Sequence, residues 1–368
     1  MIYHIGRFAL QDLIGPVARA TAALSRLDER LAQSPVREGW IERSHFQDAA
    51  AALWLLGELV HLEDLVLHDA HMDIRAPTHE LTRAHAVLRA RRQILAQPAD
   101  WALSQPGLRH LTGRGVPTTQ NKGEGRAEPE PDALTERLPD ESLTAAFAAI
   151  DAVLERTASL LNGADVPVRV PALPTPDRPS LVYDLDWNEE ARLDEWQDVL
   201  AQTRDLPPVL RAALLLDAWA EIEVLQHAVW LGPLLIAALL RQEGLATAHL
   251  PCLHLGAQKI PRERRRARDR NERLLAFLEA IHQMALTGLA EHDRLTLAKR
   301  QMERRLRDRR ASSKLPQVIE LVLARPLVST PMIQERLKVS KQGALNLIGE
   351  LNLREMTGRG RFRAWGIL

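Results

Sequence analysis

The chain has 368 residues and a net charge of zero, with 48 Lys and Arg balanced by 48 Asp and Glu, so two or three domains are expected. Its 46% hydrophobic and 26% charged residues are typical of a globular protein. The single Cys252 excludes an internal disulfide and a cysteine-based zinc site. The first seven residues lack the apolar core of a signal peptide, and the most apolar run, residues 224–240, is too short to span a bilayer. We therefore expect a cytoplasmic protein with no membrane partner.

Two long apolar segments open the chain, and abundant Ala, Leu and Arg favour helices there. Residues 8–32 carry apolar side chains at helical spacing and predict one helix, interrupted near Pro16. A second helix is predicted from Ile41 to about Asp69, apolar on most of its circumference and therefore buried.

A polar stripe lies on this second predicted helix. His61, Asp64, His68 and His71 follow one another at spacings of three and four residues, so one face would carry all of them. Imidazoles and a carboxylate could together bind a metal ion. A hydrogen-bonded seam or a solvated face is the alternative, and we favour it because no fourth ligand is recognisable. We predict no metal and no cofactor.

The middle of the chain shifts in composition. Thr78 is predicted to cap a helix from His79 to Leu95. Residues 112–142 hold Gly, Pro, Thr and Glu with almost no large apolar residue, which predicts a flexible linker. An Ala-rich helix over 143–161 and an extended strap with five prolines over 166–180 follow. The predicted domains are an N-terminal helical region (1–111), the linker (112–142), a helical body (143–312) and a C-terminal domain (313–368).

Helices are predicted again from residue 188 to residue 240, with residues 224–240 as a central buried helix that ends at Gly244. Two further helices, 269–288 and 290–310, would close the body. Arginine runs flank them, either as solvated faces or as auxiliary phosphate contacts beside the C-terminal domain. Residues 262–368 hold 24 basic and 12 acidic side chains, so they carry +12 and the first 261 residues carry −12.

The last forty residues predict a winged helix-turn-helix domain. Thr330 would cap a helix that ends at Leu337, and Ser340 would cap a second helix from Lys341 to Leu351. Residues 316–324 would add a short apolar helix that completes a three-helix core. Two positions depart from the usual turn pattern: Gln334 stands where Ala is common, and Lys338 stands where Gly is common.

The second helix of this domain would read the major groove of DNA, because its outward side chains are a cation and two amides. Residues 353–356 and 361–365 predict two strands that form a wing with a glycine-rich tip. Residues 314–368 hold nine Lys and Arg against four Asp and Glu, which suits phosphate contact. The predicted DNA-binding residues are Lys338, Ser340, Lys341, Gln342, Asn346, Arg354, Arg359, Arg361 and Arg363.

Three stretches resemble the Fic family of adenylyltransferases. Residues 34–39 (Ser-Pro-Val-Arg-Glu-Gly) are similar to its inhibitory motif, residues 232–253 to the region after its catalytic loop, and residues 339–359 to its C-terminal winged helix. The resemblance implies a Fic-like helical body. In place of the catalytic His-Pro-Phe-x-Asp/Glu-Gly-Asn-Gly-Lys/Arg motif stand residues 220–231, which hold His227 and no Gly-rich loop for phosphates. We therefore expect a degenerate active site, with Glu38 as an ordinary helix N-terminal carboxylate.

The whole chain is also similar, through residues 62–70 and 73–81, to a family of uncharacterised bacterial proteins with a helix-turn-helix DNA-binding domain. We predict a mainly α protein: a multi-helix Fic-like body and a C-terminal winged helix-turn-helix with a small β-hairpin. It would be a transcriptional regulator that binds double-stranded DNA, a homodimer and not an enzyme. The alternatives are a remodelled nucleotidyltransferase or metal-dependent enzyme, and an antitoxin-like module that binds a protein.

Overall fold

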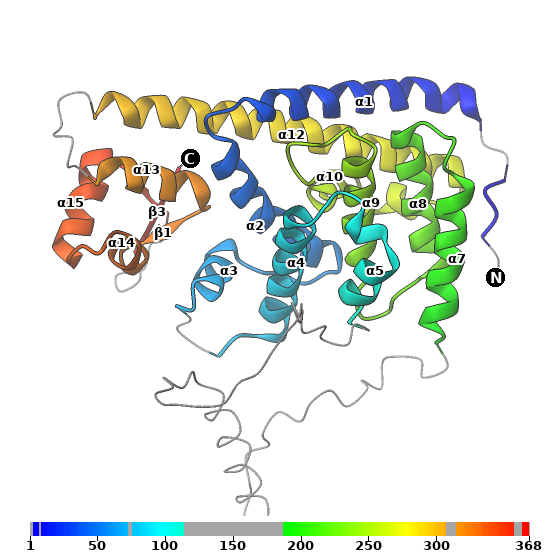
Figure 1. Ribbon diagram of the computed structural model, residues 1–368, viewed down its shortest axis with the longest axis horizontal. Helices are drawn as coiled ribbons and strands as arrows, with labels where there is room; N and C mark the ends of the chain where they lie inside the picture. The colour runs from blue at the N-terminus through cyan, green and yellow to red at the C-terminus, as the bar shows by residue number, and fades with distance from the viewer. Residues whose placement is uncertain are drawn as a thin grey trace, which may run out of the picture. The chain divides into compact units, whose positions relative to one another are not determined.

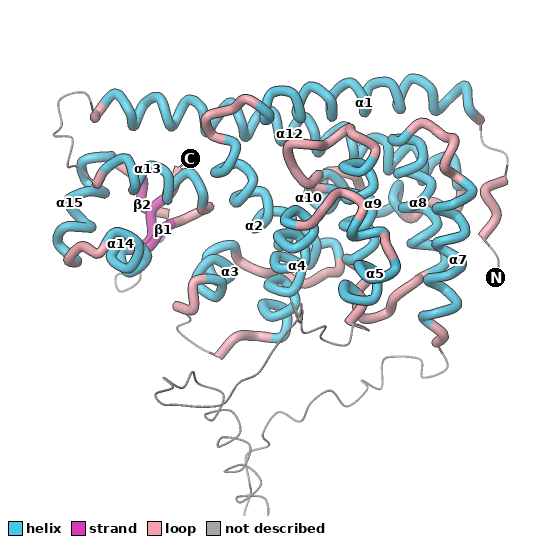
Figure 2. Tube along the Cα trace, in the orientation of Figure 1, coloured by secondary structure: helices cyan, strands magenta, loops and turns pink. Residues whose placement is uncertain are grey.

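Helices make up most of the protein, and a small antiparallel sheet lies near the C-terminus, as Figure 1 and Figure 2 show. The computed structural model describes residues 3–6, 9–72, 76–113, 187–306, 314–356 and 363–367. The predicted fold class, mainly helical with a short C-terminal hairpin, is confirmed. Within these ranges no helix has the length and apolar character needed to cross a membrane.

The first helix, α1 (Leu10–Ala32), is continuous, so the predicted interruption at Pro16 is wrong. Proline removes one backbone hydrogen bond inside a helix, at a cost of about 3 kcal/mol. Helix α1 lies along the long helix α12 (Arg270–Arg304), as Figure 1 shows. On its apolar face, Leu13, Leu24 and Leu27 are fully inaccessible to solvent. Burial of each such side chain contributes about 1.5–3 kcal/mol, which outweighs the loss.

The predicted second helix is two helices, α2 (Arg37–Leu55) and α3 (Leu62–Asp69). The chain turns at Gly57, whose φ of 87° lies in the left-handed region that favours glycine. The predicted polar stripe therefore does not share one helix: His61 precedes α3, and His71 follows it with φ of 54°.

Thr78 caps α4 (His79–Ala96) as predicted, because its hydroxyl accepts a hydrogen bond from the Leu81 amide at 3.3 Å. The short helices η1 (Trp101–Leu103) and α5 (Gln105–Leu111) follow. The predicted linker beyond residue 113, the Ala-rich helix over 143–161 and the proline-rich strap over 166–180 lie outside the described residues.

Three helices follow: α7 (Glu189–Gln202), α8 (Pro208–Ile222) and α9 (Leu231–Gln242). The predicted central helix over 224–240 begins late, because Glu223 adopts a left-handed conformation that ends α8 and leaves residues 224–230 irregular. Gly232 lets α9 approach α8, since a Cβ there would lie 2.4 Å from the ring of Trp219. Gly244 follows the end of α9 with φ of 76°, as predicted.

The body closes with α10 (Leu253–Gln258), α11 (Arg262–Arg265) and α12 (Arg270–Arg304). The two helices predicted over 269–310 are one helix of 35 residues. Gly288 does not break it, because Leu27 and Trp40 fill the space beside this glycine and the Trp40 indole donates to the Gly288 carbonyl at 3.0 Å.

Buried polar groups hold the segment between α9 and α10 to the N-terminal helices. Asp28 of α1 accepts from the Ala248 amide at 2.7 Å, and Arg91 of α4 donates to the Leu250 carbonyl at 3.0 Å. Asp48 of α2, fully buried, pairs with Arg91 at 2.5 Å. Helices from before residue 113 and after residue 187 thus share one core.

The C-terminal elements are α13 (Leu315–Ala324), β1 (Val328–Ser329), α14 (Thr330–Leu337), α15 (Lys341–Leu351), β2 (Arg354–Glu355) and β3 (Ala364–Gly366). The strand order is β1-β3-β2, with Val328 opposite Trp365 and Arg354 opposite Gly366. Strand β1 was not predicted, because two residues are too short to show alternation.

Candidate nucleic-acid interface

The three C-terminal helices pack around one apolar centre. Side chains from each helix are buried there, and strand β1 carries the chain from α13 to α14. The cap of α14 is Ser329 and not the predicted Thr330: the Ser329 hydroxyl accepts from the Met332 amide at 3.4 Å, and Thr330 is the first helical residue. The buried set is Leu315, Val318, Ile319, Val322, Met332, Ile333, Leu337, Ala344, Ile348 and Leu351.

The turn between α14 and α15 depends on two residues. Lys338 ends α14 with φ of 52°, a left-handed conformation that glycine adopts at less cost, and its side chain is exposed. Ser340 caps α15 as predicted, since its hydroxyl accepts from the Gly343 amide at 3.1 Å. Together they fix the angle between the two helices.

Helix α15 has a buried face and an exposed polar face. Lys341, Gln342 and Asn346 are exposed, whereas Ala344 and Ile348 are buried. Gln342 and Asn346 lie one helical turn apart, and the Gln342 amide donates a hydrogen bond to the Asn346 side-chain oxygen at 2.9 Å. The pair keeps an amide oxygen and an amide nitrogen that can bond the edge of a base.

The hairpin after α15 carries the remaining predicted contacts. The Met356 amide donates to the Ala364 carbonyl at 2.8 Å and joins the two strands. Arg354 is exposed on β2, whereas Arg363 donates from Nη2 to Glu355 at 2.6 Å and lies over the Trp365 ring. The carboxylate raises the pKa of Arg363. Arg359 and Arg361 lie outside the described residues.

The helix-turn-helix elements are docked on the body through α13. Arg43 of α2 donates to the Val322 carbonyl at 3.1 Å, at the end of α13 where helix carbonyls lack partners. Burial lowers the pKa of Arg43 to about 10, against the opposing effect of Glu291 at 3.2 Å, so Arg43 stays charged at neutral pH. Gly39 permits the approach, since a Cβ there would meet the Leu323 backbone at 3.0 Å.

Sequence reasoning missed this docking. A charged residue such as Arg43 within an apolar helix was the available signal, because a buried cation requires partners.

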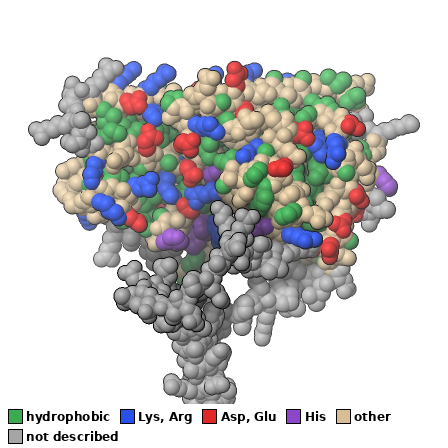
Figure 3. All heavy atoms as spheres, in the orientation of Figure 1, with side chains coloured by type: hydrophobic (Ala, Val, Ile, Leu, Met, Phe, Trp, Pro, Cys, Tyr) green, Lys and Arg blue, Asp and Glu red, His purple; other side chains and the backbone are tan. Residues whose placement is uncertain are grey.

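Further contacts reach the domain from α12, where Arg294 donates to the Ile367 carbonyl at 2.7 Å and Lys299 pairs with Glu320 at 2.8 Å. Figure 3 shows Lys and Arg side chains among acidic ones over the C-terminal helices on the face drawn.

The histidine stripe does not assemble into a metal site. Within the described part of the chain, no three His, Cys, Asp or Glu side chains converge as metal ligands. His68 instead stacks edge-on against His85 of α4, with ring centroids 4.8 Å apart, while His61 and His71 are exposed. Burial and the proximity of His68 lower the pKa of His85.

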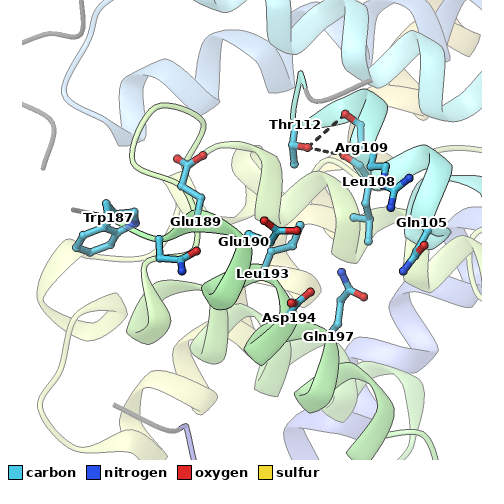
Figure 4. A pocket seen from close by; sticks show the side chains of 11 residues that line it. Gln105, Leu108, Arg109, Thr112, Trp187, Glu189, Glu190, Leu193, Asp194 and Gln197 are labelled. Carbon is cyan, nitrogen blue, oxygen red and sulfur yellow. Dashed lines mark hydrogen bonds between the residues drawn. The ribbon is translucent and has the colours of Figure 1, made fainter. Parts of the chain in front are cut away.

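A cavity of about 610 Å³ lies between α5 and the start of α7, and Figure 4 shows its lining. Glu189, Glu190 and Asp194 make it acidic, and Arg109 of α5 also lines it. Glu189 also pairs with His227 at 2.9 Å. We assign the cavity no ligand.

The stretches predicted to resemble Fic proteins include both exposed and buried residues. Glu38 is exposed in the first turn of α2, and its neighbour Gly39 contacts α13. His227 lies in the irregular segment before α9. Burial raises the pKa of the Cys252 thiol to about 11, which keeps it protonated at neutral pH.

Comparison with known proteins agrees with the position of these elements. A family model described as an HTH DNA binding domain matches residues 315–368, and another, described as a protein of unknown function (DUF1612), matches residues 181–307. The chain is similar to the uncharacterized protein y4cF of Sinorhizobium fredii (strain NBRC 101917 / NGR234), with 50% identity over 386 aligned positions that cover 100% of both chains. The chain therefore belongs to the family of y4cF, and it carries a helix-turn-helix DNA-binding domain after a domain of unknown function.

Proposed function

We propose that this protein is a transcriptional regulator that reads duplex DNA by placing α15 in the major groove. The observation that carries the proposal is the exposed polar face formed by Lys341, Gln342 and Asn346 in the first two turns of α15. The N-terminal part of a recognition helix is the part that reaches base edges. An amide pair suits an adenine, and a lysine suits phosphate or guanine.

The hairpin would serve as the wing. Arg354 is free to approach a phosphate, and the predicted contacts Arg359 and Arg361 belong to the segment that joins β2 to β3. The ion pair of Arg363 with Glu355 supports a second role for Arg363, that of holding the two strands together. The wing residues would bind phosphates or the minor groove.

The body would position and regulate the reader. Because Arg43 and Gly39 dock α13 directly on α2, a change in the body would move the recognition helix. We infer a homodimer, since a symmetric operator requires two readers. We also infer a catalytically inactive Fic-like body that needs no cofactor, and a cytoplasmic location where chromosomal DNA is accessible.

The test is a titration of random duplex DNA at two salt concentrations with the full-length protein and a Lys341→Ala, Asn346→Ala double variant. Deletion of the C-terminal domain is unsuitable, because it would expose the face of α2 that carries Gly39 and Arg43. The matched control is Arg300→Ala with Gln301→Ala, which removes one cation and one amide from exposed positions of α12.

We expect salt-dependent binding of random DNA by all three proteins, weakest for the double variant because it lacks the Lys341 ammonium. On the operator selected as described next, the double variant should bind about tenfold or more weakly than the wild-type and control proteins. Selection from a random-sequence library would then identify the operator. Equal binding by all three proteins to random DNA and to the selected operator would exclude α15 as the reader. An absence of DNA binding at low salt would favour the protein-interaction alternative.

A further inference from the structure

A dense basic segment, residues 259–268, lies far along the chain from the helix-turn-helix. It contains Lys259, Arg262, Arg264, Arg265, Arg266 and Arg268 against one acid, Glu263, so ten residues carry a net charge of +5. We call residues 259–268 the basic loop. Helix α11 occupies only four of its positions.

The backbone of the basic loop is fixed in place. Ile260 is buried against Ala276 and Ala280 of α12, apart from the main core. Arg265 donates from Nε to the Ile260 carbonyl at 3.0 Å, and Arg273 of α12 donates to the Ala267 carbonyl at 3.1 Å. These contacts hold the backbone that carries the charged side chains before any partner binds, which reduces the entropy lost on binding.

Most charged side chains of the loop face solvent. Lys259 and the arginines at 262, 264, 266 and 268 are exposed, and none forms an ion pair with any described residue. Next to them Arg270 and Arg273 are neutralised by Asp217, at 3.1 and 2.6 Å. Burial and the like charges of Arg266 and Arg262 lower the pKa of Arg265, a sign of repulsion that an anion would relieve.

The loop and the helix-turn-helix lie at opposite ends of α12. The loop precedes Arg270 at the start of this helix, and Arg305, just beyond its end, donates to the Glu350 carbonyl of α15 at 3.4 Å. At about 1.5 Å per residue, 35 residues separate the two ends by about 50 Å. The sequence-based alternative placed both arginine runs beside the C-terminal domain. For the arginines at 262–266 this alternative is wrong, because they lie at the opposite end of α12.

We propose that the basic loop is a second phosphate-binding surface for duplex DNA, a proposal that rests on the proposed DNA-binding function. On straight B-DNA, about 50 Å corresponds to about 15 base pairs, so the loop would contact the same duplex well outside the reach of α15, or hold a second duplex. Guanidinium groups bind phosphate oxygens with two hydrogen bonds each, independently of sequence.

The composition of the loop favours duplex DNA over other polyanions. No aromatic residue occurs between residues 231 and 276, and stacking on aromatic rings is the usual means of binding unpaired bases. Ile260 is the large aliphatic residue of the loop, and it is buried against the protein. It is therefore not available for insertion into a lipid surface. A fixed array of arginines remains, which matches a regular phosphate backbone.

The test replaces Arg262, Arg264, Arg266 and Arg268 with Gln and leaves Arg265, which holds the backbone, unchanged. The control replaces four exposed arginines elsewhere, Arg19, Arg26, Arg89 and Arg204, with Gln, so that both variants lose the same charge. Circular dichroism and thermal unfolding would verify that each variant folds. Binding to a duplex of about 45 base pairs, long enough to span both surfaces, is measured across a range of salt concentrations.

The slope of log K against log salt concentration is negative, and each lost phosphate contact makes it shallower by about 0.9. We expect the slope of the loop variant to be shallower than that of wild type by about 3 to 4. The control should retain the wild-type slope. Equal slopes for wild type, loop variant and control would overturn the proposal. Loss of binding to phosphatidylglycerol vesicles, with DNA binding unchanged, would also overturn it in favour of a membrane surface.

Two further experiments are needed. One tests the basic loop independently of α15, and the other distinguishes contact with one duplex from contact with two. The Lys341→Ala, Asn346→Ala variant tests α15 alone: if only the loop variant loses affinity, the major-groove proposal fails and the loop stands, and the reverse result has the reverse meaning. Capture of a second, differently labelled duplex indicates two DNA molecules, whereas a footprint extended by about 15 base pairs indicates one.

Discussion

Arg325, just after α13, donates from Nη1 to Oδ2 of Asp69 at the end of α3 at 2.9 Å. The same carboxylate pairs with Arg92 of α4 at 2.6 Å, and both guanidinium groups lie over the Phe46 ring. Burial would raise the pKa of Asp69, but Arg92 and Arg325 outweigh it and lower this pKa. One nearly buried carboxylate thus joins the DNA-binding domain to two helices of the body.

The first prediction concerns this carboxylate. Asp69→Asn should lower the free energy of unfolding by about 1–3 kcal/mol, because it leaves two guanidinium groups with a weaker acceptor. Asp293→Asn is the control, since its pair with Arg30 is exposed and should contribute little. Chemical denaturation measures both. Equal effects of the two substitutions would show that Asp69 does not stabilise the docked domain.

Local signals in the sequence predicted several helix caps and helix bounds correctly. Ser340 and Thr78 cap the helices expected of them, and the bounds of α15 agree with the prediction, because capping and apolar spacing depend on neighbours within one helix. The left-handed Lys338 also stands where a glycine is common. These features are readable because no distant contact is needed to produce them.

Features that depend on distant contacts could not be read. Gly288 suggested a break within α12, yet Trp40 and Leu27, more than 240 residues earlier, fill the space beside it. The docking role of Arg43 follows from carbonyls of α13, which no local pattern relates to α2. The cap of α14 shifted by one residue because Ser329 and Thr330 can both cap a helix.

The second prediction concerns a glycine beneath the basic loop. Gly256→Ala should destabilise the protein by about 1–3 kcal/mol, because the new Cβ would lie 2.2 Å from the Ala280 carbonyl oxygen and α10 would have to move away from α12. Gly349→Ala of α15 is the control, since its Cβ would meet nothing within 4 Å and should stabilise a helix by about 0.5–1 kcal/mol. Thermal unfolding distinguishes the two; similar shifts for both would contradict the close packing.

The third prediction separates stability from DNA contact at one residue. Lys338→Gly should raise the free energy of unfolding by about 1 kcal/mol, because glycine adopts the left-handed conformation without strain. The same change should lower the salt slope of DNA binding by about 0.9 if the Lys338 ammonium contacts a phosphate. Lys338→Gln, which keeps the strain and removes the charge, should change only the slope. An unchanged slope in both variants would remove Lys338 from the interface.

The fourth prediction divides the roles of two residues on α15. Asn346→Ala should cost about 1–3 kcal/mol on the selected operator and relax the preference at one or two base pairs, because it removes half of the Gln342–Asn346 pair. Lys341→Ala should weaken binding to all sequences alike if the lysine contacts phosphate. Competition between operator and random DNA measures both. A uniform loss for Asn346→Ala would mean that the amide does not read a base.

The last prediction concerns pH. His45 and His249 are buried, and desolvation lowers the pKa of each below the ordinary value near 6.5. The unfolded chain then binds more protons than the folded chain as the pH falls below about 6.5, so stability should fall there by up to about 1.4 kcal/mol per pH unit for each histidine.

Asp28 affects stability only at lower pH. Burial alone would raise its pKa, but hydrogen bonds from His249, Thr247 and Ala248 outweigh it and lower the pKa to about 2. The contribution of Asp28 to stability is complete above the unfolded-state pKa of about 3.9 and is lost only below it.

The experiment is denaturation of His45→Leu between about pH 5 and 7. The free energy of unfolding should depend on pH less steeply in this variant than in wild type, whereas the exposed control His79→Gln should keep the wild-type dependence. The same slope in His45→Leu as in wild type would show that folding does not lower the pKa of His45.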